Sequence, residues 1–235
     1  MKHFDEYNNE KPKRRFAYLM ELQSTSEQKD MSSPVNPLKQ NLTDSFGYIQ
    51  FTHLSPSSKL IDIFINGVKI YKQISYKQLT NKLALPASSY HIDIYPTDVM
   101  VSSLLSRKIE VLPETLHNIA LSGEANDMKY TDTPTSIAIK NSSHVKFIHL
   151  VADGPSFRPV ILTPKSEELP LIQYKQSSNW MNLSPSILQG CIYGYPYRDY
   201  LTSFRFHLQP QKQHLIYIFG SVTGNPPLEL MVLIQ

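Results

Sequence analysis

The sequence is poor in the residues and patterns that build most catalytic or metal sites. It has one cysteine in 235 residues, Cys191, so no disulfide can form within the chain. Only eight glycines occur, and they form no phosphate-cradling loop or nucleophile elbow. The acidic residues are dispersed, without a glycosidase pair. We therefore expect a protein that is not an enzyme, with no catalytic residue, no metal site and no cofactor.

Long hydrophobic runs and an excess of one charge are also missing. No stretch approaches the roughly 20 apolar residues of a membrane-spanning helix, which predicts no membrane span. The formal net charge of +3 is spread over mixed charges, which argues against binding to nucleic acid. The first residues contain no apolar segment typical of a secretory signal, so a cytoplasmic protein is expected. A spore or cell-surface layer is the alternative location.

The first 45 residues are polar. They carry seven basic and seven acidic side chains among many Ser, Asn and Gln residues. Such a segment buries too little apolar surface to offset its ordering entropy, so residues 1–45 are predicted to be a largely disordered tail. Phe16, Leu19 and Met20 have the spacing of a short amphipathic helix, and a peptide that docks onto a partner is the alternative.

The rest of the chain contains an internal repeat. Phe51-Thr52-His53-Leu54 returns as Phe147-Ile148-His149-Leu150, and Ile74-Ser75-Tyr76-Lys77-Gln78 returns as Ile172-Gln173-Tyr174-Lys175-Gln176. Further matches keep the same order: Asn81 and Asn179, Leu85 and Leu183, Tyr95-Pro96 and Tyr195-Pro196, Pro113 and Pro210, Gly123 and Gly220. A nearly constant offset predicts two copies of one structural unit, with small length changes in turns. We place these copies at residues 46–140 and 141–235.

Short extended runs separated by turn residues indicate an all-β fold. The expected strands are 48–54, 60–65, 68–71, 83–85, 90–95, 107–112, 116–121 and 137–139, then 145–150, 160–163, 189–195, 204–208, 215–219 and 228–234. Asn66-Gly67 joins two of them and predicts a hairpin, because a type I′ turn needs positive φ at both central positions. The chain is therefore predicted to form two tandem β-sandwich domains of the immunoglobulin or transthyretin kind.

Motifs of the first copy resemble one known family. Their order is Thr52-His53-Leu54-Ser55-Pro56, Ile61-Asp62-Ile63-Phe64-Ile65-Asn66-Gly67, Leu85-Pro86-Ala87 and Tyr90-His91-Ile92-Asp93-Ile94-Tyr95-Pro96. This order is similar to that of the bacterial domain-of-unknown-function family 4397. The resemblance covers residues 46–123 and extends to 143–235 only through the repeat. It implies a β-sandwich without assigned enzymatic activity, and many members of the family resemble secreted or anchored surface proteins. The second copy departs from the motif, since Asp62 falls near Val160.

Two histidines and the cysteine are the candidates for chemistry. His53 and His149 are equivalent in the repeat, and each could either line a pocket or bond to a turn carbonyl at a strand end. The second role is the one we expect, because no metal-ligating residue stands at ligand spacing. Cys191 would need a nearby base such as His207 or His214 to act as a thiol nucleophile, and no spacing indicates one.

Aromatic residues concentrate in the second copy. They are Trp180, Tyr193, Tyr195, Tyr197, Tyr200, Phe204 and Phe206. In a regular strand Tyr193, Tyr195 and Tyr197 share one face, which either fills the seam between the copies or forms an exposed strip for a partner or a sugar.

The combined expectation is a non-enzymatic protein that binds another macromolecule, with a protein partner as the first choice. Its binding residues would be Trp180, Tyr193, Tyr195, Tyr197 and Tyr200, with His53 and His149 as further candidates. A carbohydrate- or envelope-binding module is the alternative, and a thiol- or histidine-dependent hydrolase is the third possibility.

Overall fold

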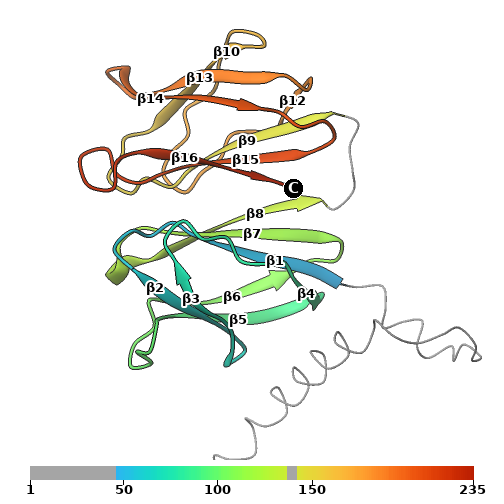
Figure 1. Ribbon diagram of the computed structural model, residues 1–235, viewed down its shortest axis with the longest axis vertical. Coiled ribbons are helices and arrows are strands. Elements are labelled where there is room, and N and C mark those ends of the chain that lie inside the picture. The colour runs from blue at the N-terminus through green and yellow to red at the C-terminus, as the bar shows by residue number, and fades with distance from the viewer. Residues whose placement is uncertain (1–45, 137–141) are drawn as a thin grey trace, which may run out of the picture.

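The structure is a computed structural model that describes residues 46–136 and 142–235, and it is an all-β protein (Figure 1). Sixteen strands form four sheets of four strands each. A 3-10 turn at Ala125–Asp127 is the only helical element in these two ranges. The predicted tail at 1–45, the predicted strand at 137–139 and the predicted boundary between residues 140 and 141 all lie outside the described residues.

The first unit is a sandwich of two sheets with strand orders β4-β1-β7-β8 and β3-β2-β5-β6. Its strands are β1 Phe46–His53, β2 Leu60–Ile65, β3 Val68–Ser75, β4 Leu83–Pro86, β5 Ser88–Pro96, β6 Leu105–Val111, β7 Thr115–Ser122 and β8 Lys129–Ser136. The hairpin between β2 and β3 has φ of 48° at Asn66 and 77° at Gly67, which confirms the predicted turn. Strand β8 was not predicted, because its polar sequence lacks the apolar alternation that reveals a buried strand.

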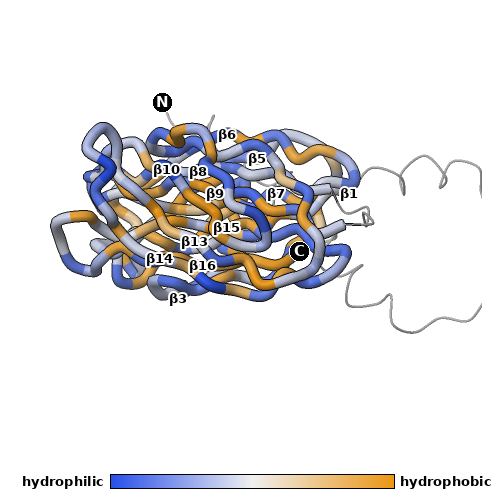
Figure 2. The backbone as a smooth tube through the Cα atoms, turned by 90° about the horizontal axis from the view of Figure 1, so that it is seen from above, coloured by the Kyte–Doolittle hydropathy of each residue, from blue (hydrophilic) through white to orange (hydrophobic). Residues whose placement is uncertain are grey.

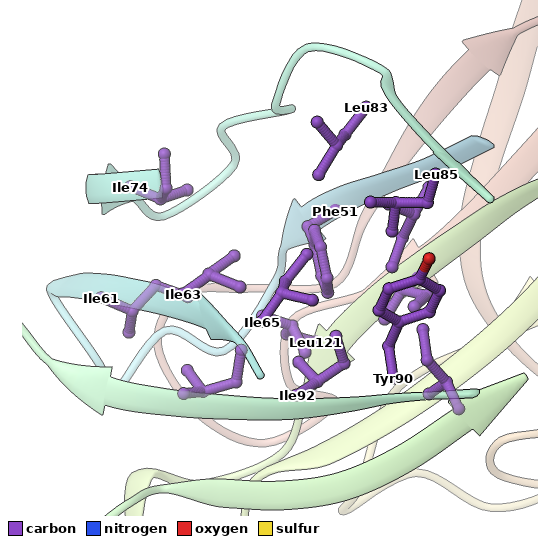
Figure 3. Packing of buried hydrophobic residues seen from close by; sticks show 14 of the residues in the cluster. Phe51, Ile61, Ile63, Ile65, Ile74, Leu83, Leu85, Tyr90, Ile92 and Leu121 are labelled. Carbon is purple, nitrogen blue, oxygen red and sulfur yellow. The ribbon is translucent and has the colours of Figure 1, made fainter. Parts of the chain in front are cut away.

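Period-two alternation explains the core of this unit. Ile61, Ile63 and Ile65 of β2 point inward and are fully buried. They meet side chains of β1, β4, β5 and β7 between the two sheets, where Phe51 is at the centre (Figure 3). Viewed from above, hydrophobic residues run along the strands in the middle of the body, and hydrophilic residues dominate the loops (Figure 2).

The second unit repeats this arrangement with orders β12-β9-β15-β16 and β11-β10-β13-β14. Its strands are β9 Ser143–His149, β10 Phe157–Thr163, β11 Glu167–Glu168, β12 Met181–Leu183, β13 Ile187–Gly194, β14 Asp199–His207, β15 Gln213–Phe219 and β16 Glu229–Ile234. Each strand has its counterpart at the same place in the other unit, including the parallel pairs β1–β7 and β9–β15. The duplication read from the sequence is therefore a duplication of the fold.

The strand order distinguishes between the two kinds of sandwich that the sequence suggested. In an immunoglobulin domain the first strand pairs with the second, and the third, sixth and seventh form the other sheet. Here the first strand pairs with the fourth and the seventh. The all-β tandem sandwich is confirmed, and its strand order differs from that of an immunoglobulin domain.

The two units pack through their inner sheets. Strands β9, β15 and β16 lie next to β7 and β8 in Figure 1. A hydrophobic cluster fills this seam, with members Leu54, Ala120, Ile148, Leu150, Leu215, Tyr217, Phe219 and Leu233. The side-chain amide of Gln235 donates to Gln50 at 3.1 Å and to Asn118 at 2.9 Å, and Lys77 pairs with Glu229 at 2.6 Å. The copies therefore form one continuous body.

The seam is chemically asymmetric although the units share a fold. The second unit contributes six of the eight cluster members, including Tyr217 and Phe219. At the positions of these two residues the first unit has Ala120 and Ser122. Large side chains from one copy therefore meet small or polar ones from the other, and the contacting faces have diverged to fit each other.

Candidate functional site

A shallow pocket opens where β13 ends and the chain turns into β14. Its volume is about 230 Å³, and it is lined by Arg158, Tyr193, Gly194, Tyr195, Pro196 and Arg198. We call it the tip pocket. Three of the four tyrosines predicted to bind a ligand lie on this turn or beside it and are exposed, to 50% for Tyr195, 84% for Tyr197 and 59% for Tyr200.

The alternation of β13 places the aromatic side chains outside. Leu188 and Ile192 point into the core with no exposed surface, whereas Tyr193 lies on the other face of the strand. The Tyr193 ring meets that of Tyr200 edge to face, with centroids 6.2 Å apart. These tyrosines belong to the outer sheet, so they do not fill the seam.

Two arginines share one carboxylate beside the tyrosines. Nη2 of Arg198 donates to both carboxylate oxygens of Glu168 at 2.6 Å, and Nη1 of Arg158 donates to Oε2 at 3.2 Å. Hydrogen bonds from Arg198, together with the charges of both guanidinium groups, hold the pKa of Glu168 below its usual range. Sequence reasoning missed these three residues, because they come from β10, β11 and the turn after β13.

The first unit has an ion pair of reversed sign at the equivalent place. Asp62 faces Tyr95 across β2 and β5, as Arg158 faces Tyr193 across β10 and β13. Lys69 and Glu168 likewise occupy matching positions on the neighbouring strands. The pair Asp62–Lys69 in one copy is thus Arg158–Glu168 in the other. The register corrects two sequence alignments: Asp62 corresponds to Arg158 rather than Val160, and Tyr95 to Tyr193 rather than Tyr195.

The two pairs differ in what surrounds them. Asp62 is buried and accepts hydrogen bonds from Lys69 at 2.6 Å, from the backbone of Gln73 at 2.9 Å and from Thr97 at 2.9 Å. Burial alone would raise the pKa of Asp62, but these donors outweigh it and lower the pKa. The first copy therefore has a closed structural ion pair where the second copy has an open pocket.

Replacing the buried carboxylate is predicted to weaken the first unit. Asp62→Asn removes the charge that pairs with Lys69 and converts one acceptor into a donor. We expect a loss of roughly 2 kcal/mol in the free energy of unfolding, measured by urea denaturation. Asp98→Asn, at an exposed position, is the control and should change stability by less than about 0.5 kcal/mol. A loss for Asp62→Asn no larger than the control would contradict this structural role.

The candidate histidines lie inside the two units and do not line the tip pocket. Nε2 of His53 bonds to the carbonyl of Ser58 at 2.6 Å, and Nε2 of His149 to that of Pro155 at 2.9 Å. Each Nδ1 accepts a backbone N–H two residues later, so the proton resides on Nε2 and the ring is neutral. Burial lowers the pKa of His53, and lowers that of His149 to about 4, against the opposing carbonyl bonds. Both side chains are fully buried, and their ring nitrogens bond to the backbone.

Trp180 lies apart from the pocket residues, whereas Cys191 is two residues before Tyr193 on β13 but does not line the pocket. Trp180 packs against the seam cluster, with Nζ of Lys146 over its ring at 4.9 Å. Cys191 faces Ser203 on β14, four residues along that strand from His207, or roughly 13 Å at strand spacing. His214 is buried in the inner sheet, where it accepts the backbone N–H of Gln209. Neither histidine is placed to activate the thiol.

A second hollow lies at one end of the seam. Its volume is about 340 Å³, and its lining includes Leu54 and Leu150, which are equivalent in the repeat. Glu124 and Asp153 are its two acidic residues, and Asp153 already accepts hydrogen bonds from Ser221 and Thr223, which hold a turn. Within the described ranges no group of three or more His, Cys, Asp or Glu residues could hold a metal ion. Nor do these ranges include a helix that is long and apolar enough to cross a membrane.

The chain is a tandem β-sandwich with a pocket lined by tyrosines and arginines at the tip of its second copy. Residues 47–159 match the model of the domain-of-unknown-function family DUF4397, which confirms the resemblance found in the sequence. The matched residues comprise the first unit, β9 and the start of β10. A search of curated proteins gives no match.

Three solved structures show distant similarity. The Bacillus anthracis TIE protein has 13% identity and a TM-score of 0.27, over 75% of this chain and 34% of its own. A leucine-rich repeat protein from Bacteroides thetaiotaomicron has 16% identity and a TM-score of 0.22, over 76% and 26%. A candidate cell adhesion protein from Bacteroides uniformis has 9% identity and a TM-score of 0.27, over 81% and 98%. This chain thus spans about a third and a quarter of the first two proteins.

Proposed function

We propose that the protein is a non-enzymatic binding protein that recognises a protein partner through the tip pocket of its second unit. The observation that carries the proposal is the cluster of exposed tyrosines on and beside the turn after β13, next to Arg198 of that turn and Arg158 of β10. Tyrosine and arginine are the residues most enriched at the energetic centres of protein interfaces, and a soluble domain rarely exposes several aromatic rings together without using them.

The surroundings of Cys191 and the histidines favour binding over catalysis. A thiol or histidine enzyme needs a nucleophile and a base within hydrogen-bond reach. Here the buried histidines are bonded to the backbone, and Cys191 has Ser203 as its cross-strand neighbour. The tip pocket supplies donors and aromatic surface but no such pair.

The proposal is tested by removing the exposed rings. The double variant Tyr195→Ser/Tyr197→Ser should lose a partner that the unaltered full chain captures from native lysate, with at least about a tenfold drop in recovery. The matched control is Leu112→Ser/Leu162→Ser, which changes two exposed apolar side chains that lie outside both the tip pocket and the loop after β5. Recovery of the same proteins in the same amounts by both double variants and the unaltered chain would overturn the proposal.

A further inference from the structure

We infer that the tip pocket binds a carboxylate of an acidic segment in a protein partner, and that this carboxylate takes the place of Glu168 between Arg158 and Arg198. This inference rests on the proposed function and adds the chemistry of the group that is recognised. It comes from comparing one position in the two copies of the fold.

The comparison shows an ion pair whose charges are exchanged between the two strands in the second copy, where it is also exposed to solvent. In the first copy the carboxylate of Asp62 is enclosed by three donors from the same unit. In the second copy the carboxylate is on the outer strand β11, and the position on β10 holds an arginine. A second arginine has been added from the turn after β13. The result is a pair of guanidinium groups turned toward a site that solvent reaches.

The charge in the pocket is unbalanced. Two guanidinium groups line it, and Glu168 supplies a single carboxylate between them. None of the six described residues that line the pocket is acidic, and Nε of Arg158 has no hydrogen-bond partner among the described residues. Guanidinium groups prefer paired contacts with carboxylates, so an anionic group is the complementary ligand.

Glu168 is held loosely enough to be displaced. It belongs to a strand of two residues that pairs with β10 through Val160 and Ile161 only. Its side chain and that of Arg198 are both well exposed, and exposed ion pairs are weak. A new rotamer of Glu168 would release both arginines without opening the sheet, since the backbone pairing of β11 does not involve the carboxylate.

Aromatic side chains line the pocket beside the two arginines. The neighbouring Tyr193 and Tyr195 would contact apolar or aromatic residues next to the ligand carboxylate, which favours an acidic peptide over a free inorganic anion.

The test uses the full chain and two short fluorescein-labelled peptides. One alternates glutamate with tyrosine, and the other has glutamine in place of each glutamate. Fluorescence polarisation should show about tenfold tighter binding of the glutamate peptide. Arg198→Gln should weaken that binding about tenfold, and Glu168→Gln should strengthen it about three- to tenfold. Arg107→Gln and Glu110→Gln on β6 make the same charge changes at exposed positions and should leave both affinities unchanged.

Three results would overturn the inference. They are equal binding of both peptides, an affinity that Glu168→Gln does not raise, and a failure of the glutamate peptide to bind at millimolar concentration. A Tyr195→Ser variant separates this inference from the proposed function. If Tyr195→Ser abolishes binding of both peptides while Arg198→Gln affects neither, the tip pocket is a binding site that recognises aromatic side chains instead of charge.

Discussion

Tyr217→Ala is expected to cost about 3–5 kcal/mol in the free energy of unfolding, the largest loss among the single changes considered. Tyr217 is fully buried and is the largest of the fully buried side chains. It lies in the seam cluster, so its removal leaves a void between two sheets that both belong to rigid sandwiches. Packed interiors relax only partly around such a void, and the cost of the cavity adds to the lost burial.

The conservative variant separates packing from hydrogen bonding. The hydroxyl of Tyr217 is buried without a hydrogen-bond partner among the described residues, and burial raises its pKa, with Asp132 adding to the effect. Tyr217→Phe keeps the ring and should therefore change stability by less than about 1 kcal/mol. Urea denaturation monitored by circular dichroism measures both variants. A loss below about 1 kcal/mol for Tyr217→Ala would show that the seam does not hold the two units together.

The second large effect is a loss of folding stability at acidic pH, caused by His149. The pKa of His149 is about 4 in the folded protein and 6.5 in its ordinary state. Between these values the unfolded chain binds more protons than the folded one, so stability falls as the pH falls. The contribution of His149 is complete above pH 6.5 and is lost on the way down to pH 4, for a total of about 3 kcal/mol. His53, whose pKa is also lowered by burial, acts in the same direction.

The pH effect is measured as a difference between two conditions. The free energy of unfolding at pH 7 minus that at pH 4.5 should be smaller by about 2–3 kcal/mol in His149→Gln than in the unaltered chain. The variant also loses the stacking of His149 on Phe157, at a centroid distance of 3.8 Å, so its stability at pH 7 drops. That drop does not affect the comparison, because the difference is taken within each protein. An equal pH dependence in both proteins would refute the assignment.

The two-sandwich architecture could be predicted from the sequence because short local patterns determine most of its strands and turns. The alternation of Ile61, Ile63 and Ile65 and the Asn66-Gly67 turn are contained in a few consecutive residues. The repeat then transferred this reading to the second half. Strands without such a pattern were missed, as β8 shows, because an edge strand with a polar sequence is defined by its neighbour rather than by its own residues.

The candidate site was predicted only in part, for a physical reason. Tyr195 and Tyr197 stand close together in the chain, so the sequence reveals that they cluster. Arg158 and Glu168 are brought next to these tyrosines by the pairing of β10 with β11 and β13, and this register cannot be read from the sequence. Trp180 is nearer in sequence to Tyr193 than Arg158 is, yet it lies at the seam. Proximity along the chain is therefore a poor guide to a site assembled from three separate segments, at Arg158, Glu168 and residues 193–198.

The packing of the two inner sheets against each other fixes how the outer loops of the two units are oriented, and this affects avidity. Equivalent strand ends, Leu54 and Leu150, meet at the same end of the molecule, so the loop after β5 and the turn after β13 also face one way. The first of these loops presents Val101 with 95% of its surface exposed. A partner that contacts both the loop after β5 and the turn after β13 would bind with avidity. The second contact costs no linker entropy, because the packed seam already fixes the distance between the two loops.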